Sequence, residues 1–143
     1  DGQQKMSKSL NNHIELALTP EETVQRVMQM VTDPARKRRS DPGNPDVCNV
    51  FSLHKVFSSP EEVAMIDFKC RRAEIGCVDC KKLLARNLNA HLAPYRQRRL
   101  ELARDLSYVD DVLSDGRQRA SEIARQTMVE VRQAIGLPLS EER

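Results

Sequence analysis

Thr19-Pro20-Glu21-Glu22 and Ser59-Pro60-Glu61-Glu62 are the two stretches of sequence that decide the fold. In each, a hydroxyl residue that can cap a helix precedes a proline at the first helical position and a glutamate three residues after the cap, the pattern of a capping box. Apolar residues at helical spacing follow both stretches and recur farther along the chain. The sequence therefore predicts an all-α fold, a helical bundle of about five helices preceded by a mobile loop, with no strand.

The other helix boundaries follow from the same periodicity and from turn formers. Ser107 is expected to cap the last helix, Gly136 with Pro138 to end it, and Pro94 to kink the helix before it. Cys77 is expected in a turn, with the helix starting after Cys80. The predicted helices cover about 19–32, 47–57, 59–70, 80–102 and 107–135.

Length and composition limit the classes of protein that the chain can represent. Its 143 residues allow one domain, or one domain plus a tail. Apolar runs of about four residues, such as 63–66, are far too short for a transmembrane helix, so no membrane association is expected. The start, residues 1–5, shows no apolar secretory segment, which favours a cytoplasmic location and reduced cysteines. A net charge of only +2 gives weak support for a nucleic-acid partner.

Lys5-Met6-Ser7-Lys8-Ser9 is the first segment that could carry chemistry. Two ammonium groups three residues apart on a loop can close over a polyphosphate, while the serine hydroxyls and backbone amides supply neutral donors. Phosphoryl chemistry needs such charge stabilisation. The alternative is a solvated loop of lysines and serines.

Four cysteines are the second candidate, and 21, 6 and 2 residues separate Cys48, Cys70, Cys77 and Cys80. Four thiolates can ligate Zn²⁺ or hold an iron–sulfur cluster, and spacing alone does not choose between them. The pair Cys-x-x-Cys is common in zinc sites, and four buried free thiols are the remaining possibility. His54 and His91 fall on apolar helix faces and are expected to be packing residues.

Basic residues form two clusters that could meet nucleic-acid phosphates. One is the loop run Arg36-Lys37-Arg38-Arg39. The other lies farther along the chain, where acidic neighbours make an ordinary solvated surface an equally good interpretation. Lys81 and Lys82, next to Cys80, are also candidates for nucleic-acid contact. The second cluster consists of Arg96, Arg98, Arg99 and Arg104.

The lysine–serine pentapeptide resembles the signature loop of class I aminoacyl-tRNA synthetases, and its flanking residues 1–2 and 10–12 are similar to the tryptophanyl branch. Residues 75–84 are closely similar to a subset of bacterial tryptophanyl enzymes that carries a four-cysteine iron–sulfur site, although the first gap is one residue shorter here. The tyrosyl enzymes are a less similar sibling. Further similar segments are 31–33, 92–94, 108–113 and 131–137.

The resemblance implies the C-terminal part of a ligase that activates tryptophan with ATP and charges tRNA(Trp). It assigns residues 1–18 to the catalytic loop and linker of a nucleotide-binding Rossmann domain that would lie upstream, and residues 19–143 to a helical anticodon-binding domain. Lys5 and Lys8 would be catalytic, and residues 5–9 would contact ATP with its Mg²⁺. The chain alone is expected to be inactive, because tryptophan and ATP would bind through the upstream domain, and the full-length enzyme is expected to be a homodimer.

The resemblance further implies one [4Fe–4S] cluster on the four cysteines, with zinc as the alternative, and tRNA contacts from Lys81 and Lys82. A different reading is a stand-alone metal-binding helical module that binds RNA without catalysis. A purely structural helix bundle is the third interpretation.

Overall fold

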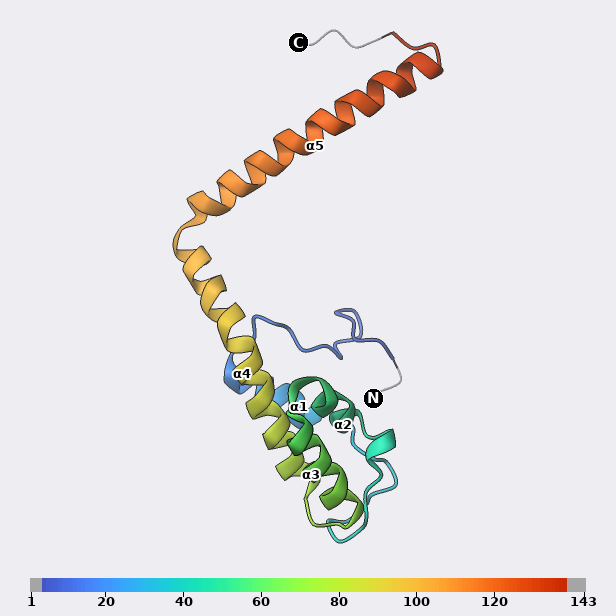
Figure 1. Ribbon diagram of the computed structural model, residues 1–143, viewed down its shortest axis with the longest axis vertical. Coiled ribbons are helices and arrows are strands. Elements are labelled where there is room, and N and C mark those ends of the chain that lie inside the picture. Colours follow the sequence, from blue (N-terminus) through green and yellow to red (C-terminus); the bar gives the residue numbers. More distant parts are fainter. Residues whose placement is uncertain (1–3, 139–143) are drawn as a thin grey trace. The chain divides into compact units, whose positions relative to one another are not determined.

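The structure is a computed structural model that describes residues 4–138. The all-α prediction is confirmed, because the described residues contain five α-helices, one short 3₁₀ helix and no strand (Figure 1). The elements are α1 (Pro20–Gln29), η1 (Pro45–Val47), α2 (Asn49–Phe57), α3 (Pro60–Arg71), α4 (Cys77–Arg104) and α5 (Leu106–Ala134).

The two proline-containing start signals both begin helices, but only the first forms the full capping box. Thr19 Oγ1 accepts from the backbone N–H of Glu22 at 3.2 Å, and the Glu22 carboxylate accepts from the backbone N–H of Thr19 at 2.8 Å. Ser59 caps α3 in the same way, accepting from the backbone N–H of Glu62 at 3.3 Å. The Glu62 carboxylate turns instead to Asn87 of α4, whose Nδ2 donates to it at 2.6 Å. A contact between helices has replaced the second half of the box.

Two helix starts differ from the predicted ones, whereas Pro94 lies inside its helix as predicted. Helix α4 begins at Cys77, not after Cys80, so both cysteines lie in its first turn. Pro94 lies inside α4, which continues to Arg104. The cap of α5 is Asp105, whose carboxylate accepts from the backbone N–H of Ser107 at 3.1 Å. Aspartate accepts this bond at least as well as serine does, so the helix starts earlier than predicted.

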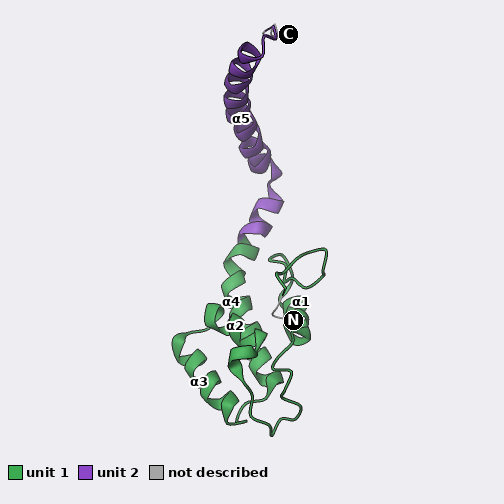
Figure 2. Cartoon of the chain, turned by 90° about the vertical axis from the view of Figure 1, so that its right-hand side faces the viewer, with its two compact units in different colours: residues 1–97 green, residues 98–143 purple. Residues whose placement is uncertain are grey.

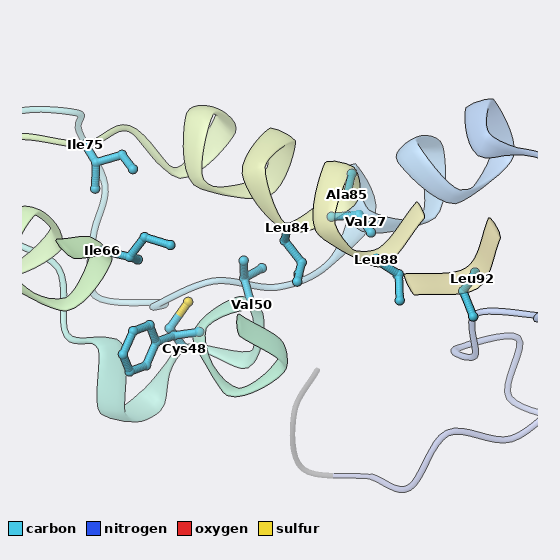
Figure 3. Packing of buried hydrophobic residues seen from close by; sticks show 10 residues of the cluster. Val27, Cys48, Val50, Ile66, Ile75, Leu84, Ala85, Leu88 and Leu92 are labelled. Carbon is cyan, nitrogen blue, oxygen red and sulfur yellow. The ribbon is translucent and has the colours of Figure 1, made fainter. Parts of the chain in front are cut away.

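The chain divides into two compact units, residues 1–97 and 98–143 (Figure 2). In the first unit, α1, α2 and α3 gather around the first part of α4 and share one apolar core (Figure 1). Val50 and Leu84 are fully buried there, and their side chains face each other across the core (Figure 3). The buried apolar residues are Val27, Cys48, Val50, Phe51, Ile66, Ile75, Leu84, Ala85, Leu88 and Leu92.

In the second unit, α5 holds the predicted helical periodicity but buries none of its described residues. Leu113 is 66% exposed and Ile123 is 67% exposed. The helix is therefore defined by its local sequence pattern. Among residues 4–138, no helix combines the length and apolarity that crossing a membrane would require.

Candidate functional site

The lysine–serine loop presents both of its ammonium groups to solvent. Lys5 and Lys8 are exposed, and neither forms an ion pair within residues 4–138. The loop backbone is held by its own polar side chains: the Ser7 and Ser9 hydroxyl oxygens lie 2.8 Å apart, and Asn12 Oδ1 accepts from the backbone N–H of Ser7 at 2.7 Å. The two cations are free to meet an anion while the segment between them is already shaped.

Two longer-range contacts attach this loop to the helices. Arg26 of α1 donates to Asn11 Oδ1 at 2.8 Å, and Asn11 adopts the left-handed region at φ 50°. Met6, at the centre of the loop, lines an apolar cavity of about 340 Å³ together with Phe57 of α2 and Tyr95 of α4. Lys5 and Lys8 are thus exposed, while Met6, itself 44% exposed, borders an apolar cavity beside the helices.

The four cysteines lie at helix ends that come together in the first unit. Cys48 is the N-cap of α2, Cys70 lies in the last turn of α3, and Cys77 and Cys80 lie in the first turn of α4. All four are free thiols; Cys48 is buried and the other three are half-buried. Short helices joined by tight turns place these ends side by side, although the residues are far apart in the sequence.

The thiols are near enough to influence one another electrostatically. Burial, together with the charges of Cys48, Cys70 and Cys77, raises the pKa of Cys80 to about 12. Burial also raises the pKa of Cys70, against which the Arg36 guanidinium acts to lower it. Thiolates at this position therefore need a positive charge beside them.

Arg36 supplies such a charge, which sequence reasoning missed by assigning it to an outward-facing basic run. Its Nη1 lies 3.9 Å from Cys70 Sγ and 3.7 Å from Cys77 Sγ. Its Nη2 donates to the carbonyl oxygens of Arg39 at 2.8 Å and Ile75 at 2.9 Å. Its Nε is buried and has no hydrogen-bond partner among the described residues. No feature of sequence spacing distinguishes this arginine from its basic neighbours.

Gly43 packs closely against both Cys70 and Arg36. A Cβ at this position would lie 2.6 Å from Cys70 Sγ, which leaves no room for any side chain. Its backbone N–H donates to the carbonyl oxygen of Cys70 at 3.0 Å. The turn containing Gly43 is thus packed directly on the cysteine site.

The buried His54 borders Cys80, as expected of a packing residue. Its Nε2 lies 3.1 Å from the carbonyl oxygen of Cys80 and 3.4 Å from Cys80 Sγ, and its Nδ1 lies 2.6 Å from Ser58 Oγ. Burial lowers the pKa of His54, which favours the neutral ring. His91 also packs against aromatic residues, with its ring 5.2 Å from that of Phe57 and 6.0 Å from that of Tyr95, but it is more exposed than expected.

The residues at this site fit a thiolate-bound metal group in their chemistry. Within residues 4–138, no three His, Cys, Asp or Glu side chains are already grouped to hold a metal ion. The four interacting thiols, the partly unsatisfied Arg36 guanidinium and the close approach of the Gly43 backbone to Cys70 Sγ are nevertheless compatible with a sulfur-ligated centre. A metal ion or cluster would supply the positive charge that four clustered thiolates need.

The basic loop adjoins the cysteine site. A cavity of about 480 Å³ is lined by residues 36–39, by Gly76 and by the first residues of α4, 77–79. Lys37 and Arg38 are exposed, and Asp41 accepts from their backbone N–H groups, not from their side chains. Arg39 lies 3.6 Å from Asp79. Two of the four basic side chains are thus available to an anion.

The remaining candidate cations have different surroundings. Lys82 is exposed, whereas Lys81 Nζ donates to the carbonyl oxygen of Met28 at 2.8 Å. In the second basic cluster, Arg96 donates to Thr23 Oγ1 at 2.7 Å, and Arg98 lies 3.2 Å from Glu101. These two arginines already have protein partners.

Comparison with known proteins places this helical chain and its lysine–serine loop in a family. Residues 1–93 match the family described as tRNA synthetases class I (W and Y). The chain belongs to this family.

Individual relatives point to the tryptophanyl branch. The chain is 48% identical over 134 residues to the tryptophan–tRNA ligase of Thermotoga maritima, and 44% identical over 135 residues to that of Aquifex aeolicus. These alignments cover 93% and 94% of the chain but only 41% and 34% of the relatives. The chain therefore spans about two fifths of their length or less.

A solved structure agrees with this assignment. The crystal structure of tryptophanyl-tRNA synthetase from Campylobacter jejuni matches with a TM-score of 0.80 at 26% identity, over 93% of this chain and 42% of that one. The same enzyme is also known complexed with ADP and tryptophan. The resemblance to the C-terminal part of bacterial tryptophanyl enzymes is confirmed.

Proposed function

We propose that the chain is the C-terminal portion of a tryptophan–tRNA ligase, which activates tryptophan with ATP and transfers it to tRNA(Trp). The observation that carries the proposal is the 48% identity to the Thermotoga maritima ligase over 134 residues, together with two exposed lysines on the signature loop. Residues 1–18 would belong functionally to an upstream nucleotide-binding domain, and residues 19–143 would form the anticodon-binding domain. The full-length enzyme would work as a cytoplasmic homodimer.

The role proposed for the loop is electrostatic. As the tryptophan carboxylate attacks the α-phosphorus of ATP, negative charge builds on the departing pyrophosphate, and Lys5 and Lys8 would stabilise it beside Mg²⁺. Ser7 and Ser9, whose hydroxyls contact each other, would shape the loop, with Met6 holding it to the apolar cavity. Because both ammonium groups are exposed here, their full effect requires ATP held by the upstream domain.

The four cysteines would hold one [4Fe–4S] cluster, with zinc as the alternative. The supporting observations are their position at converging helix ends and the Arg36 guanidinium beside two of the sulfurs. A cluster or ion bound there would tie α2, α3 and α4 together, and ligation would contribute folding free energy directly.

The RNA-binding surface would lie next to this site. Lys37 and Arg38 line the cavity that includes Cys77, and Lys82 follows Cys80 in α4; all three are exposed and would contact phosphates near the anticodon. Lys81 would join them by exchanging its bond to the carbonyl oxygen of Met28 for a phosphate.

A test of the function is to measure tRNA charging by the full-length protein with tryptophan and with tyrosine, the substrates of the two branches of the family. Charging of tRNA(Trp) with tryptophan is expected, and tyrosine should give no product. Preferential charging with tyrosine, or no charging at all, would refute the proposal. Lys55→Ala, an exposed lysine on α2 far from the loop in sequence, provides a control variant that should charge normally.

A further inference from the structure

Arg36 holds together two parts of the molecule that otherwise have separate roles. One edge of its guanidinium faces sulfur, with Nη1 at 3.9 Å from Cys70 Sγ and 3.7 Å from Cys77 Sγ. The other edge faces backbone, with Nη2 donating to Arg39 in the basic loop and to Ile75 before α4. A single side chain thus contacts the cysteine site, the basic loop and the start of α4.

The charge of this group calls for a negative partner. Arg36 is half-buried, and its guanidinium forms no hydrogen bond or ion pair with a carboxylate within residues 4–138; the Asp33 carboxylate acts on it only through its charge, and its Nε is buried without a hydrogen-bond acceptor. A desolvated cation is costly unless an anion faces it. Besides Asp33, the groups nearest its Nη1 are the Cys70 and Cys77 sulfurs, which become negative when they ligate a metal. The position of Arg36 therefore suits the loaded site better than four neutral thiols.

We propose that Arg36 is a positioning residue that couples the four-cysteine site to the RNA-facing basic loop, residues 36–39. The inference rests on the metal site proposed above. When the sulfurs are ligated, their negative charge fixes the guanidinium, which in turn holds the carbonyl of Arg39 and orders the loop that carries Lys37 and Arg38. Because coupling between two sites is reciprocal, loss of the metal loosens the loop, and loss of Arg36 loosens the metal.

The test uses the full-length protein, loaded with its metal, in three variants. Arg36→Gln removes the charge, Arg36→Lys keeps the charge but not the forked geometry, and Arg72→Gln is the matched control. Arg72 lies two residues after Cys70 but donates to Glu74 at 2.6 Å, so its loss removes a nearby charge without a contact to sulfur. Circular dichroism verifies that each variant is folded.

The first measurement is the rate at which iron or zinc passes to a chelator. Arg36→Gln should release the metal about 10-fold to 100-fold faster, the usual effect of losing a residue that supports a metal ligand. Arg36→Lys should restore part of the retention, and Arg72→Gln should match the parent. If the site holds a cluster, its reduction potential should also fall in Arg36→Gln, because a nearby cation favours the more negative reduced state.

The second measurement is tryptic cleavage after Lys37 and Arg38. Stripping the metal should accelerate cleavage in the parent, whereas Arg36→Gln should be cleaved rapidly whether loaded or stripped. The coupling would be overturned, with the metal site left intact, by either of two results. One is an equal rate of metal release from Arg36→Gln and the parent; the other is a cleavage rate of the parent that does not change when the metal is stripped. A parent protein that binds neither iron nor zinc would remove the metal site and, with it, this inference.

Discussion

The signature loop and the four-cysteine site are built in opposite ways. The loop exposes its charged atoms and is shaped by contacts between near neighbours, such as that between Ser7 and Ser9. The cysteine site collects four half-buried or buried thiols from three helix ends and depends on contacts over long sequence separations, such as Arg36 with Cys77. Substitutions in the loop should therefore affect chemistry without affecting stability, and those at the cysteine site should do the reverse.

The largest effect is expected from Lys8→Ala in the full-length protein. It should slow tryptophan-dependent pyrophosphate exchange by about 10²-fold to 10³-fold, the usual cost of one preorganised charge-stabilising donor. Tryptophan affinity and the thermal midpoint should stay unchanged, because Lys8 is exposed. Parallel losses of exchange rate and tryptophan affinity would show that Lys8 acts in the ground state, contrary to the proposed role.

Gly43→Ala tests the other half of the comparison. Its Cβ would lie 2.6 Å from Cys70 Sγ, so overpacking should destabilise the protein by about 1–3 kcal/mol. Gly116→Ala in α5 is a matched control, since a Cβ there meets nothing within 4 Å and should stabilise the helix by roughly 0.5–1 kcal/mol. Denaturant unfolding measures both changes, and a neutral Gly43→Ala would mean that the space beside Cys70 is not tightly packed.

Asp33 anchors the loop that covers the cysteine site, and the contribution of its carboxylate to folding stability should depend on pH. Backbone N–H bonds from Asn44 and Ala35, each 2.8 Å, lower the pKa of this buried carboxyl below its ordinary 3.8. A lowered folded-state pKa contributes stability above pH 3.8, and this contribution is lost as the pH falls through the folded pKa. Asp33→Asn should cost about 1–2 kcal/mol near neutral pH. The cost should shrink below pH 4, and a cost independent of pH would contradict the assignment.

The smallest effect is expected from Lys82→Ala, which should weaken binding of the cognate anticodon stem-loop modestly. If Lys82 contacts one phosphate, the dependence of log Kd on log salt should lose about one unit of slope. Lys81→Ala should also weaken binding, but it removes a bond to Met28 as well, so Lys82 is the cleaner probe. Unchanged affinity and an unchanged salt slope in both variants would show that these lysines do not contact the RNA and belong to an ordinary solvated surface.

Local patterns were predictable from sequence, whereas inter-helix contacts were not. The Thr19 cap and the periodicity of α5 depend on residues within a few positions of one another, and both were confirmed. The turn of Glu62 toward Asn87 and of Arg36 toward Cys77 depends on which helices become neighbours. Sequence spacing carries no information about that choice. The resemblance of the pentapeptide to a signature loop provided the family, which no periodicity could have supplied.

The composition of the cysteine site tests the central claim most directly. Full-length protein purified without oxygen should contain iron and acid-labile sulfide in equal amounts, about four of each per chain, and Cys80→Ser should lose both. Stoichiometric zinc without sulfide would contradict the cluster but keep the ligand set. Absence of any metal, with all four thiols alkylated in the folded protein, would contradict the site itself.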